Sequence, residues 1–152
     1  MIALDEAEGI VESFYRRLKS VSAVVTDIKL SPDAWSLREI VGHLVDSASN
    51  NHQRFVRLQQ NNLEGFPGYD QEFWVERQGY NSVDWQALRE LWVLYNRLLL
   101  HVIGLAYQND RLRNSWISEN GSHTLEWIID DYFRHLRWHV QQFEERLDQV
   151  TS

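Results

Sequence analysis

Apolar residues recur every three to four positions in four long segments of this chain, which is the spacing of one face of an α-helix. The pattern predicts helices over residues 4–25, 37–60, 83–107 and 125–149. No internal repeat, low-complexity tract or linker separates these segments. Four long helices in one domain, residues 1–152, predict an all-α protein with the architecture of a four-helix bundle.

Two of the helices carry clear start signals. Ser36 and Glu39 stand three residues apart in the capping-box pattern, so the second helix should begin at Leu37. Thr124 is placed to cap the last helix. The polar stretch before it contains Asn-Gly at positions 120–121, which indicates the two-residue turn of a small β-hairpin.

A long connection, residues 61–81, joins the second and third helices. Loops longer than about 12–15 residues in a compact domain are usually functional or contain short structure of their own. Asp70 can cap one or two helical turns here, with Gly79 ending them. The segment is long enough to cross the bundle. Tyr69 and Trp74 within it either line a pocket or seal one end of the core, and the sequence does not decide between the two.

The last helix carries two histidines, His135 and His139, which are four residues apart and therefore lie one turn above the other. Their face also carries Ile128, Tyr132 and Phe143, so it should turn toward the core. A buried polar group without a partner costs roughly 1–3 kcal/mol. The pair is therefore either hydrogen-bonded within the core or bound to a divalent metal ion.

A catalytic zinc ion usually needs three protein ligands, and the second helix offers a third. Steps of three and four residues from Ile40 trace a polar seam along this otherwise aliphatic helix, through His43, Ser47, Asn50 and Arg54. Helices built only for packing rarely carry such a seam. His43 is therefore the predicted third ligand.

The other histidines fit such a site less well. His52 is about 900° of helical rotation from His43 and lies on nearly the opposite face. His123 lies roughly 18 Å along the helix axis from His135. His101, late in the third helix, remains a candidate for a fourth ligand or for a supporting residue behind the ligands.

Two carboxylates are the candidate catalytic groups. Asp46 follows His43 by three residues and Asp131 precedes His135 by one turn, so each can accept a hydrogen bond from the free ring N–H of a ligand. Each can equally be an ordinary helix acid that faces solvent. The residues expected to line the pocket or to support the ligands are Ser47, Asn50, Arg54, Tyr69, Asp70, Trp74 and His101.

The composition excludes several other classes of protein. The formal net charge is −7, and nucleic-acid-binding proteins carry a basic face instead, so no nucleic-acid partner is expected. There is no cysteine, which excludes disulfides, cysteine nucleophiles and thiolate metal sites. The N-terminus is acidic and no run of about 18 apolar residues occurs, so we expect no signal peptide, no membrane span and a cytoplasmic protein.

The chemistry of a three-histidine site follows from its ligands. Neutral imidazoles bind several divalent ions; zinc is the first candidate, and nickel, iron and manganese are the alternatives. Such a zinc ion lowers the pKa of a bound water toward about 7 and activates the water, or a substrate thiol in its place. The His-Glu-x-x-His pattern of metalloproteases and the Glu-x-x-His pairs of di-iron bundles are both absent.

Taken together, these residues resemble the DinB-like superfamily. The resemblance rests on Trp35 to Phe55, on Phe-Pro-Gly-Tyr-Asp at 66–70 and on the terminal histidine pair, and it extends from about residue 10 to residue 147. It implies a bundle whose second and third helices are joined by a long crossover, with a divalent metal on three histidines. Those positions fall on His43, His135 and His139. Many relatives carry a further histidine just before the last ligand, where this chain has Trp138.

The resemblance leaves three hypotheses. Relatives include proteins described as hydrolases and others that transfer groups to low-molecular-weight thiols, so the first is a metal-dependent enzyme that acts on a small molecule, with or without a thiol cofactor. The second is a non-catalytic bundle that binds a metal or ligand in stress response, in which His101 or a carboxylate closes the fourth metal position. The third is a metal-free bundle. In it, surplus tryptophans make a homodimer face, and the candidates are Trp74, Trp85, Trp92, Trp127 and Trp138.

Overall fold

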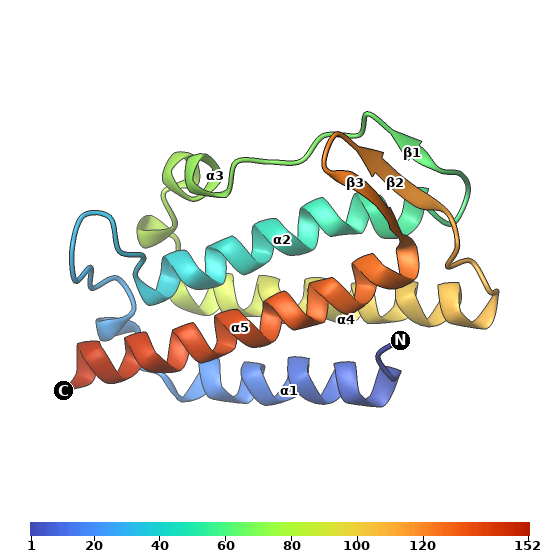
Figure 1. Ribbon diagram of the computed structural model, residues 1–152. Helices are drawn as coiled ribbons and strands as arrows, with labels where there is room; N and C mark the ends of the chain where they lie inside the picture. Colours follow the sequence, from blue (N-terminus) through green and yellow to red (C-terminus); the bar gives the residue numbers. More distant parts are fainter.

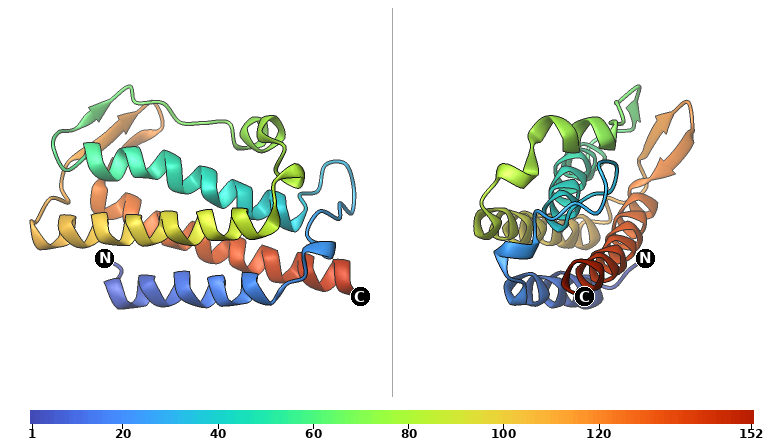
Figure 2. Two further views of the ribbon diagram at one scale, coloured as in Figure 1. Left: turned by 180° about the vertical axis from the view of Figure 1, so that it is seen from behind. Right: turned by 90° about the vertical axis from the view of Figure 1, so that its left-hand side faces the viewer.

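The computed structural model describes all residues, 1–152. Four long helices lie alongside one another and form a bundle (Figure 1). They are α1 (Leu4–Ser20), α2 (Leu37–Arg57), α4 (Trp85–Gln108) and α5 (Leu125–Thr151). Seen along its axis in Figure 2, the bundle has one helix at each corner, with α2 next to both α4 and α5. The predicted fold class, a four-helix bundle with a long crossover between its second and third long helices, is therefore confirmed.

Local sequence sets where the helices start. The side chain of Ser36 accepts a hydrogen bond from the Glu39 N–H, and the Glu39 carboxylate accepts one from the Ser36 N–H, both at 3.1 Å. This is the predicted capping box, and α2 begins at Leu37 as expected. Thr124 Oγ1 caps α5 by accepting from the Trp127 N–H at 3.2 Å.

The first helix is shorter than its apolar pattern predicts. α1 ends at Ser20, and a separate 3₁₀ turn, η1 (Ala23–Val25), follows. Thr26 after this turn accepts two hydrogen bonds from Arg38, on its backbone oxygen at 2.8 Å and on its hydroxyl at 2.7 Å. The turn is thus tied to the first turns of α2. The apolar spacing within one helix does not reveal this contact, because Thr26 and Arg38 are 12 residues apart in the sequence and lie in different segments.

The crossover contains the short helix that the sequence suggests. α3 (Gln71–Gln78) is capped by Asp70, which accepts from the Phe73 N–H at 3.1 Å. It ends at Gly79, whose φ of 58° lies in the left-handed region that glycine adopts without strain. A second 3₁₀ turn, η2 (Tyr80–Ser82), then leads into α4.

A small sheet covers the end of α2 and the start of α5 (Figure 1). The predicted hairpin is present as β2 (Ser115–Ser118) and β3 (Gly121–Thr124), which pair antiparallel. The sequence pattern did not reveal β1 (Leu63–Glu64), which pairs parallel with β2, because two residues show no period. Trp116 in β2 donates its indole N–H to the Phe66 carbonyl at 2.9 Å. The sheet therefore fixes the first half of the crossover over the bundle.

The core lies between the four long helices. Trp92 is fully buried, and its ring meets Phe14 edge-on with 5.1 Å between centroids. Phe14 in turn meets Phe143 edge-on at 5.3 Å, so α4, α1 and α5 share one aromatic cluster. None of the helices combines the length and the apolar character that crossing a lipid bilayer requires.

Candidate metal centre

Three histidine side chains converge between α2 and α5. The Nε2 atom of His135 lies 3.3 Å from Nε2 of His43 and 3.0 Å from Nε2 of His139. One ring nitrogen from each of the three lies within 4.8 Å of the other two. His43 and His139 are buried, and His135 is half-buried. The structure thus brings the three predicted ligands together, and no aspartate or glutamate joins the group.

Two features of the chain produce this convergence. α2 and α5 pack against each other and run in opposite directions (Figure 1), so the N-terminal third of α2 meets the middle of α5. Trp35, just before α2, then covers the group: its ring centroid is 4.9 Å from that of His43 and 6.4 Å from that of His139. The indole shields the histidines from water on that side.

The histidines are neutral near pH 7 when no metal is bound. Burial, and then the positive charge that His139 and His135 would carry, lowers the pKa of His43 to about 3. Burial is also the main reason that the pKa of His135 falls to about 4 and that the pKa of His139 is lowered. A neutral imidazole keeps a lone pair on one ring nitrogen, and this is the form that binds a metal ion.

These pKa values predict that the metal-free protein loses stability in mild acid. His43 and His135 take up a proton near pH 6.5 when unfolded, but only near pH 3 and pH 4, respectively, when folded. The unfolded state therefore binds more protons below about pH 6.5, and the free energy of unfolding should fall by up to about 1.4 kcal/mol per pH unit for each such histidine. Urea unfolding at pH 7.5, 6.5 and 5.5 measures this slope. His135→Gln should flatten it, and an equally steep slope in that variant would contradict the assignment.

The group suits a divalent cation. The side-chain Oε1 of Gln142 accepts a hydrogen bond from the His139 Nδ1–H at 2.8 Å, which leaves the lone pair of that ring on Nε2, the atom that faces His135. Lone pairs at such short separations repel unless a proton or a cation lies between them. Two nitrogens that are each about 2.0–2.1 Å from one tetrahedral zinc ion lie about 3.3 Å apart. The two separations measured from His135 are close to this value.

Asp46 does not hold His43 as the helical spacing predicts. Its Oδ1 accepts hydrogen bonds from the Tyr80 hydroxyl at 2.5 Å and from the Gln78 side-chain amide at 2.8 Å. The His43 Nδ1 atom and the Asp46 Oδ2 atom are both buried without a partner. Tyr80 and Gln78 belong to the crossover between α2 and α4. Helical spacing does not predict where the crossover lies, so it could not reveal these two bonds to Asp46. Burial, moreover, raises the pKa of Asp46.

A cavity of about 350 Å³ adjoins the histidines. His135 and Asp131 of α5 line it on one side, Ser47 and Arg54 of α2 on the other, and Tyr69 of the crossover lines it as well. Ligand pockets in proteins typically measure about 300–1,000 Å³, so this cavity has the volume of a small-molecule site. Asp131 forms an ion pair with the neighbouring Arg134 and makes no hydrogen bond to the His135 ring.

The other residues predicted for the site, Asn50, Asp70, Trp74 and His101, are not among those that line the cavity. Asn50 donates to a backbone carbonyl one turn earlier in α2, at 2.9 Å. Asp70 caps α3, and Trp74 packs edge-on against Tyr69 with 5.3 Å between ring centroids. His101 is exposed on α4 and is not part of the histidine group.

Sequence reasoning missed several residues of the site. Gln142 follows His139 by three residues, so the spacing of one helix face could have revealed it. Trp127 precedes Asp131 by four residues on α5, so the same spacing could have revealed it. Trp35, Tyr80 and Trp116 carry no such signal, because turns and the sheet decide where these aromatic rings lie. Trp116 and Trp127 both line the cavity.

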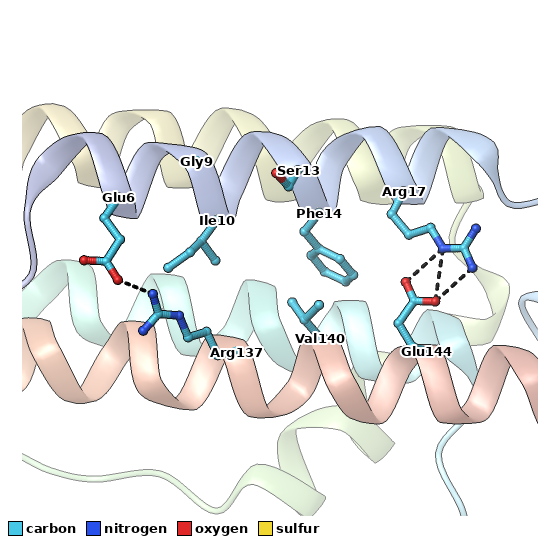
Figure 3. Close-up of a pocket in the computed structure, with 9 residues that line it drawn as sticks. All are labelled: Glu6, Gly9, Ile10, Ser13, Phe14, Arg17, Arg137, Val140 and Glu144. Atoms are coloured by element: carbon cyan, nitrogen blue, oxygen red, sulfur yellow. Dashed lines mark hydrogen bonds and ion pairs between the residues drawn. The ribbon is translucent and has the colours of Figure 1, made fainter.

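A larger groove, of about 630 Å³, lies between α1 and α5. Figure 3 shows apolar side chains along it and an ion pair at each end: Ile10, Phe14 and Val140, then Glu6 with Arg137 and Arg17 with Glu144. Its charges are paired and it contains no histidine. Both of its carboxylates are held in ion pairs with arginines, so the smaller cavity beside the histidines is the better candidate.

The fold and the site define a class of protein: a four-helix bundle with three histidines from two helices, gathered beside a cavity. No protein-family model matches the sequence, and no curated protein matches it significantly. Among solved structures, the chain is similar to YfiT from Bacillus subtilis, described as a probable metal-dependent hydrolase with an unusual four-helix bundle topology. The TM-score is 0.81 at 18% sequence identity, over 99% of this chain and 91% of that one. At this identity the likeness establishes a shared fold, which is the bundle that the DinB-like resemblance implies.

Proposed function

We propose that the protein is a DinB-like metal-dependent enzyme that holds one divalent ion on His43, His135 and His139 and hydrolyses a small molecule bound in the adjoining cavity. The observation that carries the proposal is the convergence of three neutral histidine nitrogens in a group whose member His135 lines that cavity. Zinc is the first candidate for the ion, and nickel, iron and manganese are the alternatives.

A zinc ion on three histidines supplies Lewis-acid chemistry, which lowers the pKa of water toward about 7. The chain's own residues have separate tasks. Asp131 lines the cavity one turn before His135 and is placed to accept a proton from a group bound there. Burial raises the pKa of Tyr69 to about 12, so its hydroxyl stays protonated and can donate a hydrogen bond to a ligand. Asp46 is not among the cavity-lining residues and is engaged by Tyr80, so we assign it a structural role.

The alternatives are thiol transfer at the same centre and a non-catalytic bundle in stress response. Only three possible ligands lie in the group, His101 is remote from it, and the cavity reaches His135. These observations support an accessible site over one closed by a fourth protein ligand. They do not favour hydrolysis over thiol transfer, so the experiment has to separate these two.

The test is a hydrolysis screen on untagged protein loaded with zinc. Esters, amides, lactones and phosphoesters are offered with and without low-molecular-weight thiols, and the screen is repeated after chelation. We expect turnover that needs the metal, and a decrease of kcat/KM by about 100-fold in Asp131→Asn at unchanged metal content. Asp130→Asn is the matched control, because Asp130 bonds the N-terminal residues instead of lining the cavity. Turnover only with a thiol would establish transfer, and no turnover by the zinc-loaded protein would support the non-catalytic alternative.

A homodimer and a cytoplasmic location remain proposals. Of the candidate tryptophans, Trp127 and Trp138 are exposed, whereas Trp85 and Trp92 are buried. Self-association is better supported by a leucine stripe on the outer face of α4. Its members, 41–58% exposed, are Leu91, Leu94, Leu98 and Leu105. Their spacing of three, four and seven residues is the seam of paired helices, and sedimentation velocity of the full chain would test it.

A further inference from the structure

Arg54 is a buried cation without an anionic partner. Its side chain belongs to a residue only 5% exposed, and no carboxylate forms an ion pair with it. Two of its N–H groups donate long hydrogen bonds, to the Asn51 side chain at 3.4 Å and to the Pro67 carbonyl at 3.3 Å. Its Nε is buried with no partner at all. Burial lowers the pKa of Arg54, but an arginine stays charged in proteins. An unpaired buried charge is strongly unfavourable, which indicates that the partner comes from outside the chain.

The surroundings of Arg54 hold it in one orientation. The centre of its guanidinium lies 4.1 Å from the centroid of the Trp116 ring, a cation–π contact. The ring covers one face of the planar group and leaves the edge, where the N–H donors are, for other partners. Trp116 is itself fixed by its hydrogen bond to the Phe66 carbonyl. The guanidinium is thus preorganised by the sheet and the crossover.

Arg54 lines the same cavity as His135. Ser47, Asn51 and Arg54 follow one another by about one turn along α2, so they form a continuous wall. His43 lies roughly 16 Å from Arg54 along the axis of α2, at 1.5 Å per residue. The histidine group, which reaches the cavity through His135, is therefore well separated from Arg54 along the bundle. The aromatic rings of Tyr69, Trp116 and Trp127 also line it.

We propose that the substrate is a small molecule with a carboxylate that binds Arg54 and a flat or apolar body that packs against the aromatic rings. This proposal rests on the proposed function. A substrate whose carboxylate binds Arg54 would extend its apolar body along the cavity toward the histidines, where the metal ion would act. A carboxylate fits better than a phosphate for two reasons. Arg54 is the one cationic side chain among the lining residues, and one guanidinium fork matches one carboxylate. Asp131 in the same cavity opposes a second negative charge on the ligand.

Benzoate and its neutral analogue benzamide test the assignment by calorimetric titration of the full chain, with and without one equivalent of zinc. We expect benzoate to bind at least about tenfold more tightly than benzamide, since a charge-assisted bond to a buried group has that effect. The difference should be the same without zinc, when no metal is present to attract the carboxylate. In Arg54→Met, which keeps an unbranched apolar stem, the preference should disappear.

The outcomes separate this proposal from the proposed function. Zinc content of Arg54→Met should equal that of the wild type, so loss of benzoate binding with metal retained supports the carboxylate site alone. No saturable binding of benzoate, or equal binding of benzamide, overturns it. Tighter binding of inorganic phosphate, lost in Arg54→Met, would place a phosphate on Arg54 and also overturn it. If Arg54→Met does not fold, Arg54→Lys still gives a result, because it keeps the charge without the fork and should reduce the benzoate preference several-fold. If Arg54 only stabilised the fold, replacing it would change the free energy of unfolding and leave the preference for benzoate over benzamide unchanged.

Discussion

Replacing His135 by alanine is expected to remove the metal from the protein. The Nε2 atom of His135 lies 3.3 Å from that of His43 and 3.0 Å from that of His139, and its loss leaves two ligands where a catalytic zinc ion usually needs three. Even residues that only orient a metal ligand are worth about 10–100-fold in affinity, so losing a ligand should reduce affinity by at least about 100-fold. Elemental analysis of untagged protein should find about one ion per chain in the wild type and almost none in the variant.

The chain offers a matched control for this experiment. His101→Ala changes a histidine that is exposed on α4 and outside the group, so it should keep the full metal content. Added zinc at about 1,000 times its dissociation constant should stabilise the wild type and His101→Ala by about 4 kcal/mol. It should not stabilise His135→Ala to this extent. If the wild type takes up no zinc, nickel, iron or manganese, the metal centre is wrong, and the histidines are core residues.

Among the glycine-to-alanine substitutions in this chain, Gly42→Ala is expected to cause the largest loss of stability. A Cβ at position 42 would lie 2.1 Å from Cδ2 and 2.3 Å from Cγ of the Tyr80 ring. That ring is buried, and its hydroxyl donates to the buried Asp46 carboxylate at 2.5 Å. The ring has to move, which overpacks the core and breaks the bond to Asp46. Together these effects should lower the free energy of unfolding by about 2–5 kcal/mol.

Gly9 provides the opposite case for comparison. It lies within α1, and a Cβ there would meet nothing within 4 Å. Gly9→Ala should therefore stabilise the protein by about 0.5–1 kcal/mol through its helix propensity alone. Urea unfolding of both variants measures the two effects. In a Tyr80→Ala background the clash is absent, so Gly42→Ala should cost much less stability there than in the wild type. Wild-type stability in Gly42→Ala would mean that Tyr80 does not pack against α2 as described.

The long helices could be predicted because their signals are local. The apolar period identified all four, and the capping box at Ser36 gave the start of α2 to the residue. The same reasoning failed where a tertiary contact overrides the period. α1 ends at Ser20 because the following turn is held by Arg38 of the next helix. Similarly, β1 exists only through its pairing with β2.

The site shows the same division. Helical spacing alone placed His135 and His139 on one face and His43 on the polar seam of α2, because 3.6 residues per turn determine which side chains share a face. Only the packing of α2 against α5 decided that these faces meet, with the three ring nitrogens within 4.8 Å. The crossover decided that Asp46 bonds Tyr80 instead of His43, and β2 placed Trp116 over Arg54. The sequence by itself thus determined the helices and the composition of their faces. The tertiary structure determined the partners of those faces, because loops and helix crossings follow no period from which they could be read.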